Sequence, residues 1–273
     1  MISVIITLKN RADLLKWGLE GLCYLEDNNL ITEINIADGG STDNLEEVLN
    51  EYSSYFKINK YTIDRKDSIY NHKFNCPSLE YNFLVEKCTN DIIIKIDPEF
   101  VFITPTFIRR GLSVLQQNDS AFFMPFPYHT YDFEYNSLED IKNNYQKHYY
   151  QTHLTEAGVE AGNCRLVYYG CMFNKKYFKE LGGIDVRFVE GIGSEDDHFF
   201  DQWERKYGIG SVVSTTTEKG IHLWHGEWAK AVPNHLQEHV MANRKLRNSL
   251  NNSYPNSGDF SSVTLPKYSL TSY

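Results

Sequence analysis

The feature that most constrains the fold of this chain is an apolar run that ends abruptly in two acidic residues. Four isoleucines and a lysine make up Ile92–Ile96, and Asp97-Pro98-Glu99 follows directly. A run this rich in β-branched residues predicts a buried strand, and ligands of open α/β sheets bind beyond the carboxyl ends of such strands. Asp97 and Glu99 would repel each other unless a positive charge lies beside them. A divalent cation that carries a phosphate-bearing substrate would supply that charge. For an acidic pair taken alone, the alternative is a strand followed by a solvated turn.

Strand and helix patterns alternate along the first part of the sequence. This alternation predicts an α/β fold with a Rossmann-like, mostly parallel central sheet flanked by helices. The expected strands are Ile2–Leu8, Ile31–Ala37, Phe56–Thr62 and Asp91–Ile96, and the expected helices are Arg11–Leu25, Leu45–Tyr55, Ser78–Cys88 and Phe107–Gln117.

The second part is less regular, and a polar insert rich in Tyr and His runs from Tyr128 to Cys164. We expect this insert to form a pocket wall or a lid. We expect a catalytic domain over 1–228, with a nucleotide-binding half (1–115) and a smaller acceptor-binding half (116–228), followed by a helix and a loose tail over 229–273. The further strands are expected at Ala121–Pro127, Leu166–Asn174 and Ile221–Trp224, and the further helices at Leu138–His153, Lys175–Leu181, Glu195–Tyr207 and from Ala229 to about Asn248.

Composition narrows the class of protein. The 273 residues are 41% hydrophobic, which is enough for a sizeable core. The formal net charge of -9 argues against nucleic acid as the main partner. The five cysteines have no C-x-x-C spacing, and no apolar run approaches the ~18–20 residues of a spanning helix. Because no secretory signal pattern is visible either, we expect a cytoplasmic protein with reduced thiols.

Polar residues follow the first two strands. Asp38 ends the second strand beside Gly39 and Gly40, where a flat group can approach the backbone and a carboxylate can accept an imide N–H. Lys9 and Arg11 follow the first strand at the same edge, where they would neutralise a diphosphate. The alternatives are an ordinary helix-capping turn at Asp38 and two solvated cations.

Three acids, Glu195-Asp196-Asp197, open a predicted helix. Acids in a first turn are what the helix macrodipole favours, which is the structural explanation. The functional explanation is a general base aimed at an acceptor hydroxyl. Further on, His222 and His225 are three residues apart, so both imidazoles could reach one metal ion, and imidazole with carboxylate suits Mn²⁺. A single histidine would more often have a structural role.

Together these residues resemble the inverting GT-A glycosyltransferases of the family 2 type, with the C-terminal signature of β-1,4-galactosyltransferases and chondroitin-polymerase modules. The resemblance extends over about Ile2–Trp228. The blocks that carry it, in the family's order, are Ile5-Ile6-Thr7-Leu8-Lys9-Asn10-Arg11, Asp38-Gly39-Gly40-Ser41-Thr42-Asp43, Tyr81-Asn82, Asp97-Pro98-Glu99, Tyr177-Phe178 with Gly182-Gly183-Ile184-Asp185, Gly193-Ser194-Glu195-Asp196-Asp197, and His222 with His225.

The resemblance implies a GT-A fold and a metal-dependent inverting transfer of a hexose or N-acetylhexosamine from a UDP-sugar to a hydroxyl of a glycan or lipid-linked acceptor, as in surface polysaccharide synthesis. It implies that Asp196 is the base and that Glu195 and Asp197 bind the acceptor. The implied ligands of Mn²⁺ (or Mg²⁺) are Asp97, Glu99, His222 and His225, and the implied nucleotide contacts are Thr7, Leu8, Lys9, Arg11, Asp38, Asn82 and Asp97.

Three positions depart from the family pattern. Glu99 replaces the usual aspartate, Ile192 replaces a tryptophan of the galactosyltransferases, and His222 replaces a methionine. Their donor and acceptor preferences are therefore not transferred to this chain.

Two other functions stay open, namely a hydrolase that uses paired carboxylates and a non-catalytic sugar-nucleotide-binding module. The tail also has a small basic excess that suggests peripheral contact with the inner face of a membrane, although a helix packed on the body is the alternative. The basic residues are Lys230, Arg244, Lys245, Arg247 and Lys267, against Glu238 and Asp259.

Overall fold

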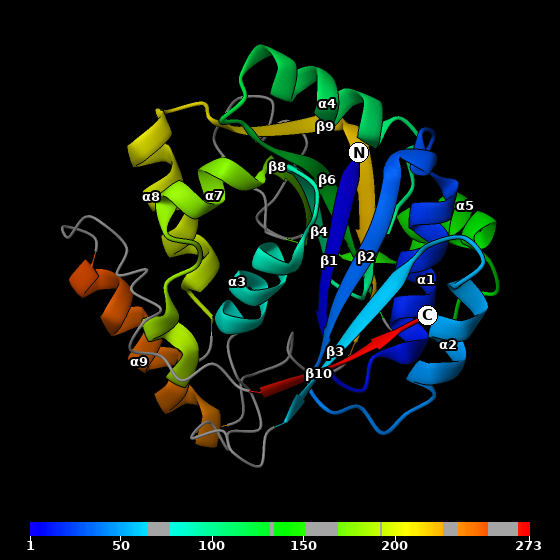
Figure 1. The fold of residues 1–273 in the computed structure, drawn as a ribbon, viewed down its shortest axis with the longest axis horizontal. Helices are drawn as coiled ribbons and strands as arrows, with labels where there is room; N and C mark the ends of the chain where they lie inside the picture. The colour runs from blue at the N-terminus through cyan, green and yellow to red at the C-terminus, as the bar shows by residue number, and fades with distance from the viewer. Residues whose placement is uncertain (65–76, 132–133, 151–168, 192, 226–233, 251–266) are drawn as a thin grey trace.

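The computed structural model describes residues 1–64, 77–131, 134–150, 169–191, 193–225, 234–250 and 267–273 (Figure 1). These residues form one ten-stranded sheet in the order β10-β3-β2-β1-β4-β8-β6-β9-β5, with β7 paired to β6. The predicted α/β fold, with a central, mostly parallel sheet between layers of helices, is confirmed. The strands are β1 (Ile2–Leu8), β2 (Ile31–Asp38), β3 (Ile58–Asp64), β4 (Ile92–Ile96), β5 (Phe100–Phe102), β6 (Phe122–Thr130), β7 (Tyr149–Tyr150), β8 (Gly170–Asn174), β9 (Val212–His222) and β10 (Lys267–Ser272).

The sheet has a parallel part and a mixed part. β3, β2, β1 and β4 run parallel, as the alternation of strands and helices predicts. β8 is antiparallel to both β4 and β6, β9 is parallel to β6, and β5 is antiparallel to β9. After β4 the chain turns into β5, which pairs with β9. The segment that follows Asp97 therefore lies against a strand more than 100 residues later in the sequence.

Helices cover both faces of the sheet (Figure 1). α1 (Ala12–Tyr24), α2 (Leu45–Tyr52) and α4 (Phe107–Gln117) share one hydrophobic cluster with the sheet. α3 (Ser78–Lys87), α7 (Lys175–Leu181) and α8 (Glu195–Tyr207) share the cluster on the other face. The remaining helices are α5 (Leu138–His148), α9 (Asn234–Leu250) and the 3₁₀ turns η1 (Asn28–Leu30) and η3 (Val186–Glu190).

α1 packs unusually close to the chain that follows β4. Leu15, Leu19 and Leu22 repeat with helical spacing and are fully buried. A Cβ at Gly18 would lie 3.0 Å from the carbonyl oxygen of Pro98, and one at Gly21 would lie 2.8 Å from the Phe102 nitrogen. Only glycine allows this approach, so α1 packs directly against the segment that contains Asp97 and Glu99.

The structure corrects several predicted boundaries. β9 is an eleven-residue strand rather than the short strand Ile221–Trp224, so that His222 ends the strand and His225 follows it. β5 and β7 were not predicted, and α5 ends at His148 instead of His153. The prediction of a loose tail is wrong for Lys267–Ser272, because β10 pairs antiparallel with β3.

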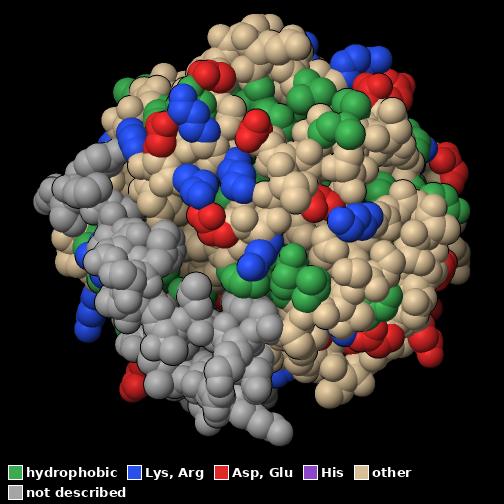
Figure 2. Space-filling model, in the orientation of Figure 1, with side chains coloured by type: hydrophobic (Ala, Val, Ile, Leu, Met, Phe, Trp, Pro, Cys, Tyr) green, Lys and Arg blue, Asp and Glu red, His purple; other side chains and the backbone are tan. Residues whose placement is uncertain are grey.

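Two findings concern the surface. Among the described residues, no helix is both long and apolar enough to cross a bilayer. On the face that Figure 2 shows, Lys and Arg side chains are interspersed with Asp and Glu over the described part of the molecule, without a broad region of one sign. This mixture agrees with the moderate net charge of -9.

Candidate active site

The carboxyl ends of three parallel strands bring the predicted nucleotide contacts to one edge of the sheet. Leu8 lies beside Asp38 across β1 and β2, and the Gly39 N–H donates to the Leu8 carbonyl at 2.8 Å. Ile5 lies beside Lys95, so Thr7 and Asp97, two residues further along each chain, reach the same edge. The topology thus places Thr7, Leu8, Asp38 and Asp97 together.

The loops after β1 and β2 are tied to each other. Asn10, in the left-handed region at φ 52°, accepts a hydrogen bond from the Thr42 N–H at 2.8 Å. The Asn10 N–H donates to the Ser41 hydroxyl at 2.9 Å, and Asp38 Oδ1 accepts the Ser41 N–H at 2.8 Å. A Cβ at Gly40 would meet nothing within 4 Å, so open space lies beside this turn.

Asp38 and Lys9 differ in exposure at this rim. Asp38 is only 3% exposed, whereas the Lys9 side chain is exposed. The Asp38 carboxylate is therefore held within the fold, whereas the Lys9 ammonium is exposed to solvent.

Glu99, His222 and His225 form a compact group of potential metal ligands. Phe100 pairs with His222 across β5 and β9, and this register brings Glu99 to the end of β9. Glu99 Oε1 lies 3.6 Å from His222 Nε2 and 3.2 Å from His225 Nε2. One ligand atom from each residue lies within 4.8 Å of the other two, a separation that one cation can bridge.

The charges around this group favour metal binding. Burial opposes the ionisation of Glu99, but a hydrogen bond from His222 and the charge of Arg11, whose Nη1 lies 3.4 Å from Glu99 Oε2, lower its pKa to about 2. Burial lowers the pKa of His225 to about 4. At neutral pH the group therefore offers an anionic carboxylate and a neutral imidazole, the forms that bind metal ions.

A divalent cation fits these residues. Nδ1 of His225 is buried and has no hydrogen-bond partner among the described residues, and the buried Oε2 of Glu99 has only its ion pair with Arg11 there. Buried polar atoms are ordinarily satisfied by a partner. The donor set of one carboxylate and two imidazoles suits Mn²⁺ or a related ion.

Asp97 lies outside this group of three. Its Oδ1 accepts hydrogen bonds from Lys95 Nζ at 2.6 Å and from the Tyr81 hydroxyl at 2.9 Å. Burial and the charge of Glu99 raise the pKa of Asp97, and Lys95, itself 1% exposed, opposes that shift. Neither Lys95 nor Tyr81 was among the predicted site residues. The available signal was a lysine inside a run of isoleucines, where a buried charge needs a partner.

The acidic triplet opens α8, as predicted. The turn before it has positive φ at Gly193 (67°) and Ser194 (69°). Asp196 Oδ1 accepts the Asp197 N–H at 2.8 Å. Burial and the charge of Asp197 raise the pKa of Asp196, and the ammonium of Lys95 opposes the shift.

Two predicted site residues have structural partners instead of open surroundings. Asp197 Oδ2 pairs with Arg247 Nη1 at 2.6 Å, where an acceptor hydroxyl was expected. The buried Asn82 amide donates to the Ile184 carbonyl at 2.7 Å and accepts the Ile184 N–H at 2.9 Å. Asn82 thus fixes the segment before α8, a role that differs from the predicted contact with the nucleotide.

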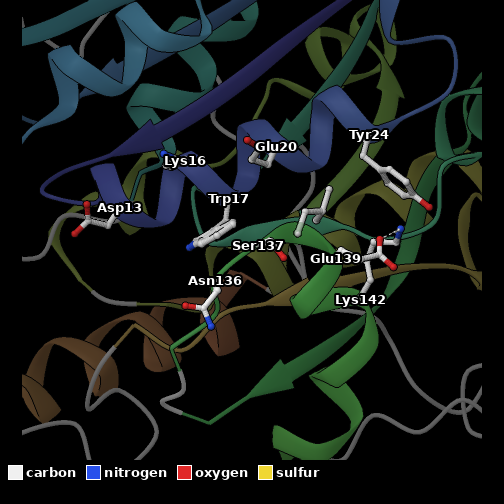
Figure 3. A pocket seen from close by; sticks show the side chains of 10 residues that line it. Asp13, Lys16, Trp17, Glu20, Tyr24, Asn136, Ser137, Glu139 and Lys142 are labelled. Carbon is white, nitrogen blue, oxygen red and sulfur yellow. Dashed lines mark hydrogen bonds and ion pairs between the residues drawn. The ribbon is translucent and has the colours of Figure 1, made fainter.

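A groove of about 760 Å³ lies between α1 and α5 (Figure 3). α5 lies within the polar insert 128–164, which therefore contributes a pocket wall. Trp17 also lines a neighbouring hollow of about 310 Å³, together with Trp224, the residue before His225. Several of the groove's charged groups are already paired, because Lys142 contacts Glu139 at 2.9 Å and the Tyr52 hydroxyl donates to Glu20 at 2.8 Å.

The sequence of residues 3–182 matches the family model described as "Glycosyl transferase family 2". The chain belongs to this family. No curated protein matches the sequence. The matched residues of this family 2 glycosyltransferase run from β1 to the end of α7 and include Asp38, Asp97 and Glu99. They do not include Asp196, His222 or His225.

Solved structures similar to this family 2 glycosyltransferase share its fold. S. aureus TarS 1-349 has a TM-score of 0.62 at 11% identity, over 96% of this chain and 72% of that one. GalNAc-T7, in a structure with UDP, GalNAc and Mn²⁺, has a TM-score of 0.61 at 11% identity, over 86% and 46% of the two chains. The mannosyltransferase PcManGT from Pyrobaculum calidifontis, in complex with GDP-Man and Mn²⁺, has a TM-score of 0.56 at 10% identity, over 94% and 66%.

Proposed function

We propose that the chain is a metal-dependent, inverting glycosyltransferase. It transfers a hexose or N-acetylhexosamine from a UDP-sugar to a hydroxyl of a glycan or lipid-linked acceptor. The observation that carries the proposal is the group of Glu99, His222 and His225 at the carboxyl edge of the sheet. That edge also holds Asp38 and Arg11, the residues proposed to bind uracil and diphosphate.

Similar structures support a nucleotide-sugar donor and a divalent metal. TarS has been solved with UDP-GlcNAc, with a TM-score of 0.58 to this chain at 11% identity. GalNAc-T7 has been solved with UDP and Mn²⁺, and PcManGT with GDP-Man and Mn²⁺. Because these proteins use both uridine and guanosine nucleotides, the choice of UDP here rests on Asp38.

Different residues of the chain bind different parts of the donor. The Asp38 carboxylate accepts the imide N–H of uracil beside Gly40, and Thr7 and Leu8 line the end of β1. Arg11 and Lys9 add positive charge where the diphosphate lies. Glu99, His222 and His225 would hold Mn²⁺ (or Mg²⁺), which when bound supplies Lewis-acid stabilisation of the charge on the leaving diphosphate. Asp97, fixed by Lys95 and Tyr81, faces the ribose or a metal ligand.

Asp196 is the proposed general base. Its carboxylate takes the proton of the acceptor hydroxyl while the hydroxyl oxygen attacks the anomeric carbon from the face opposite UDP, which inverts the configuration. Burial and the charge of Asp197 raise the pKa of Asp196, and the ammonium of Lys95 opposes this by favouring the ionised form, which is the form that accepts the proton. Glu195 lies beside Asp196 and contacts acceptor hydroxyls.

The test is the substitution Asp196→Asn in a transfer assay with a panel of UDP-sugars and saccharide acceptors. We expect kcat to fall by roughly 10²–10⁴-fold with little change in UDP affinity, because Asp196 does not bind the nucleotide. Asp91→Asn is the matched control, since Asp91 is exposed and lies directly before β4. Wild-type kcat in Asp196→Asn would refute the assignment of the base, and NMR of the product's anomeric proton tests inversion.

The same assay separates transfer from hydrolysis. If the chain releases free sugar from a UDP-sugar equally fast with and without an acceptor, it is a hydrolase and the transfer proposal fails. If UDP and Mn²⁺ bind but neither transfer nor hydrolysis occurs with any donor of the panel, the chain is a binding module.

A further inference from the structure

The C-terminal helix α9 packs against η3 and the start of α8 (Figure 1). The residues that make this contact are Asn243, Leu246, Arg247 and Leu250. Their spacing of three, one and three residues places them on one face of a helix. This face of α9 therefore reaches the segment that carries the proposed base.

Asn243 interlocks with the backbone before α8. Its side chain is 2% exposed, and its Nδ2 donates to the carbonyl of Phe188 at 3.0 Å and to that of Gly193 at 2.9 Å. A Cβ at Gly191 would collide with the Asn243 amide. The Asn243 side chain thus binds two backbone carbonyl groups that precede α8. Because Gly191 has no side chain, there is room for the Asn243 amide.

Arg247 holds the first turns of α8. Nη1 of Arg247 lies 2.6 Å from Asp197 Oδ2, and Nη2 lies 3.0 Å from Asp201 Oδ2. Asp197 and Asp201 are one helical turn apart, so their charges repel each other. The guanidinium joins both, and Leu246 and Leu250 pack with Phe188 beside this contact.

The backbone that these contacts hold needs an external restraint. Gly193 and Ser194 both have positive φ, and a non-glycine residue in that region costs energy that neighbouring structure must offset. The Ser194 side chain makes no capping hydrogen bond to α8. The Gly193 carbonyl bound by Asn243 lies directly before this strained residue, and Asp196 follows two residues after it.

We propose that Asn243 and Arg247 are positioning residues, through which α9 clamps the start of α8 and holds Asp196 in its working orientation. The inference rests on the proposed function, because it gives Asp196 the role of base. It assigns α9 a part in the acceptor side of the site. It also gives Asp197 a structural role in place of acceptor binding.

The clamp has an electrostatic consequence for Asp196. Asp197 on α8 raises the pKa of Asp196, and Lys95 on β4 opposes this. Glu195 precedes Asp196 in the same turn, and Arg247 on α9 neutralises Asp197. Without the guanidinium only Lys95 opposes the charge of Asp197, so the acidic limb of the pH–rate profile moves to higher pH.

The experiment compares Asn243→Ala and Arg247→Gln with two matched controls on the exposed side of the same helix. Asn248→Ala and Arg244→Gln remove the same chemical groups from exposed positions. For each full-length variant we would measure amide hydrogen exchange of peptides covering 186–200, UDP affinity with Mn²⁺, and kcat as a function of pH.

We expect faster exchange at the start of α8 and a kcat at least 10-fold lower in Asn243→Ala and Arg247→Gln, with UDP affinity within twofold of the wild type. The acidic limb should move upward in Arg247→Gln and stay in place in Arg247→Lys, which keeps the charge. Both controls should match the wild type. General destabilisation would instead weaken UDP binding as much as it lowers kcat, and that result would overturn the proposal.

The outcomes separate this inference from the proposed function. Wild-type exchange rates in both variants would overturn the clamp, whether or not the chain transfers a sugar. Faster exchange with an unchanged kcat would overturn the link between the clamp and Asp196. Faster exchange in a chain whose wild type transfers no sugar would support the clamp and count against the proposed function alone.

Discussion

His225 is a buried imidazole whose protonation state is coupled to folding. Burial lowers its pKa from 6.5 to about 4 in the folded chain. As pH falls from 6.5 towards 4, the unfolded chain binds a proton at this residue and the folded chain does not. Protonation therefore favours the unfolded state, and the contribution of His225 to stability is present above pH 6.5 and is lost below it.

We predict that the free energy of unfolding of the metal-free chain falls more steeply between pH 6.5 and 4 in the wild type than in His225→Gln. The difference across this window should be at most about 3 kcal/mol, since each unit of pKa shift corresponds to about 1.4 kcal/mol. Urea denaturation in EDTA at several pH values measures it. Parallel pH dependences in the two proteins would mean that His225 is not desolvated in the folded state.

Glu99 supplies the negative charge of the proposed metal group. Replacing it by Gln keeps the shape but leaves Arg11 and two imidazoles without a carboxylate. We predict that Mn²⁺ affinity, measured by titration calorimetry without nucleotide, falls by at least 10-fold. Glu47→Gln is the control, because Glu47 is exposed on α2. Equal Mn²⁺ affinity in Glu99→Gln and the wild type would refute the metal assignment.

At the residue scale, the sequence predicted which residues could bind a metal ion better than it predicted which residues pack against the site. Asp97, Glu99, His222 and His225 were predicted as a set of metal ligands, and the register of β5 with β9 brings the last three together, without Asp97. The pairing of Asp197 with Arg247 was not predictable, because nothing in the sequence shows which helix packs on α8. The same holds for Asn82, whose amide meets a backbone segment about 100 residues away.

At the scale of elements, the buried parallel strands were predictable and the partly exposed ones were not. β1, β2 and β4 are rich in isoleucine and almost completely buried, because helices cover both faces of the sheet. β9 begins Val212-Val213-Ser214-Thr215-Thr216-Thr217, and most of this part is only half-buried, so its pattern has neither alternation nor an apolar run. β10 follows a stretch rich in Ser, Asn and Pro, and its pairing with β3 links residues about 200 positions apart.

β10 is an edge strand whose contribution can be measured with a pair of proline variants. Tyr273 and Ile58 exchange both backbone hydrogen bonds, at 2.8 and 3.4 Å. This exchange repeats at every second residue of an antiparallel pair, so the N–H of Thr271 faces Lys60 on β3. The N–H of Leu270 faces away from β3, where proline is tolerated on an edge strand.

We predict that Thr271→Pro lowers the free energy of unfolding by about 1–3 kcal/mol, the cost of a lost ladder bond and an unsatisfied carbonyl. Leu270→Pro should cost less, because no hydrogen bond to β3 is removed. Chemical denaturation of the two variants measures the difference. Equal stability of both variants would show that β10 adds nothing to the folded chain in solution.

At the scale of the whole molecule, distant parts of the chain contribute to the proposed site. The first two strands and the loops after them would provide Asp38 and Arg11, the return from β4 to β9 would provide the metal group, and α8 would provide Asp196. α9 and β10 then secure α8 and the edge of the sheet. The basic excess of the C-terminal part is partly used within the fold, because Arg247 pairs with Asp197 and Asp201.

The proposed contacts of Asp38, Arg11 and the metal group predict which nucleotide-sugar stabilises the folded chain. A ligand that binds only the folded state raises stability by about 2.7 kcal/mol at a concentration of 100 Kd. We predict that a UDP-sugar with Mn²⁺ raises Tm, that a GDP-sugar with Mn²⁺ raises it less, and that EDTA removes most of the effect. The reason is that in the proposed site the Asp38 carboxylate would accept the imide N–H of uracil, while the metal group and Arg11 would bind the diphosphate that both donors share.

Thermal shift with two variants locates the discrimination. Asp38→Asn should narrow the difference between UDP- and GDP-sugars, because the amide can no longer provide an anionic acceptor for the imide. His225→Gln should reduce the shift for both donors equally. A GDP-sugar that stabilises the wild type as much as a UDP-sugar would contradict the role of Asp38. Such a result would not contradict the residues proposed to bind the diphosphate, because both donors contain this group.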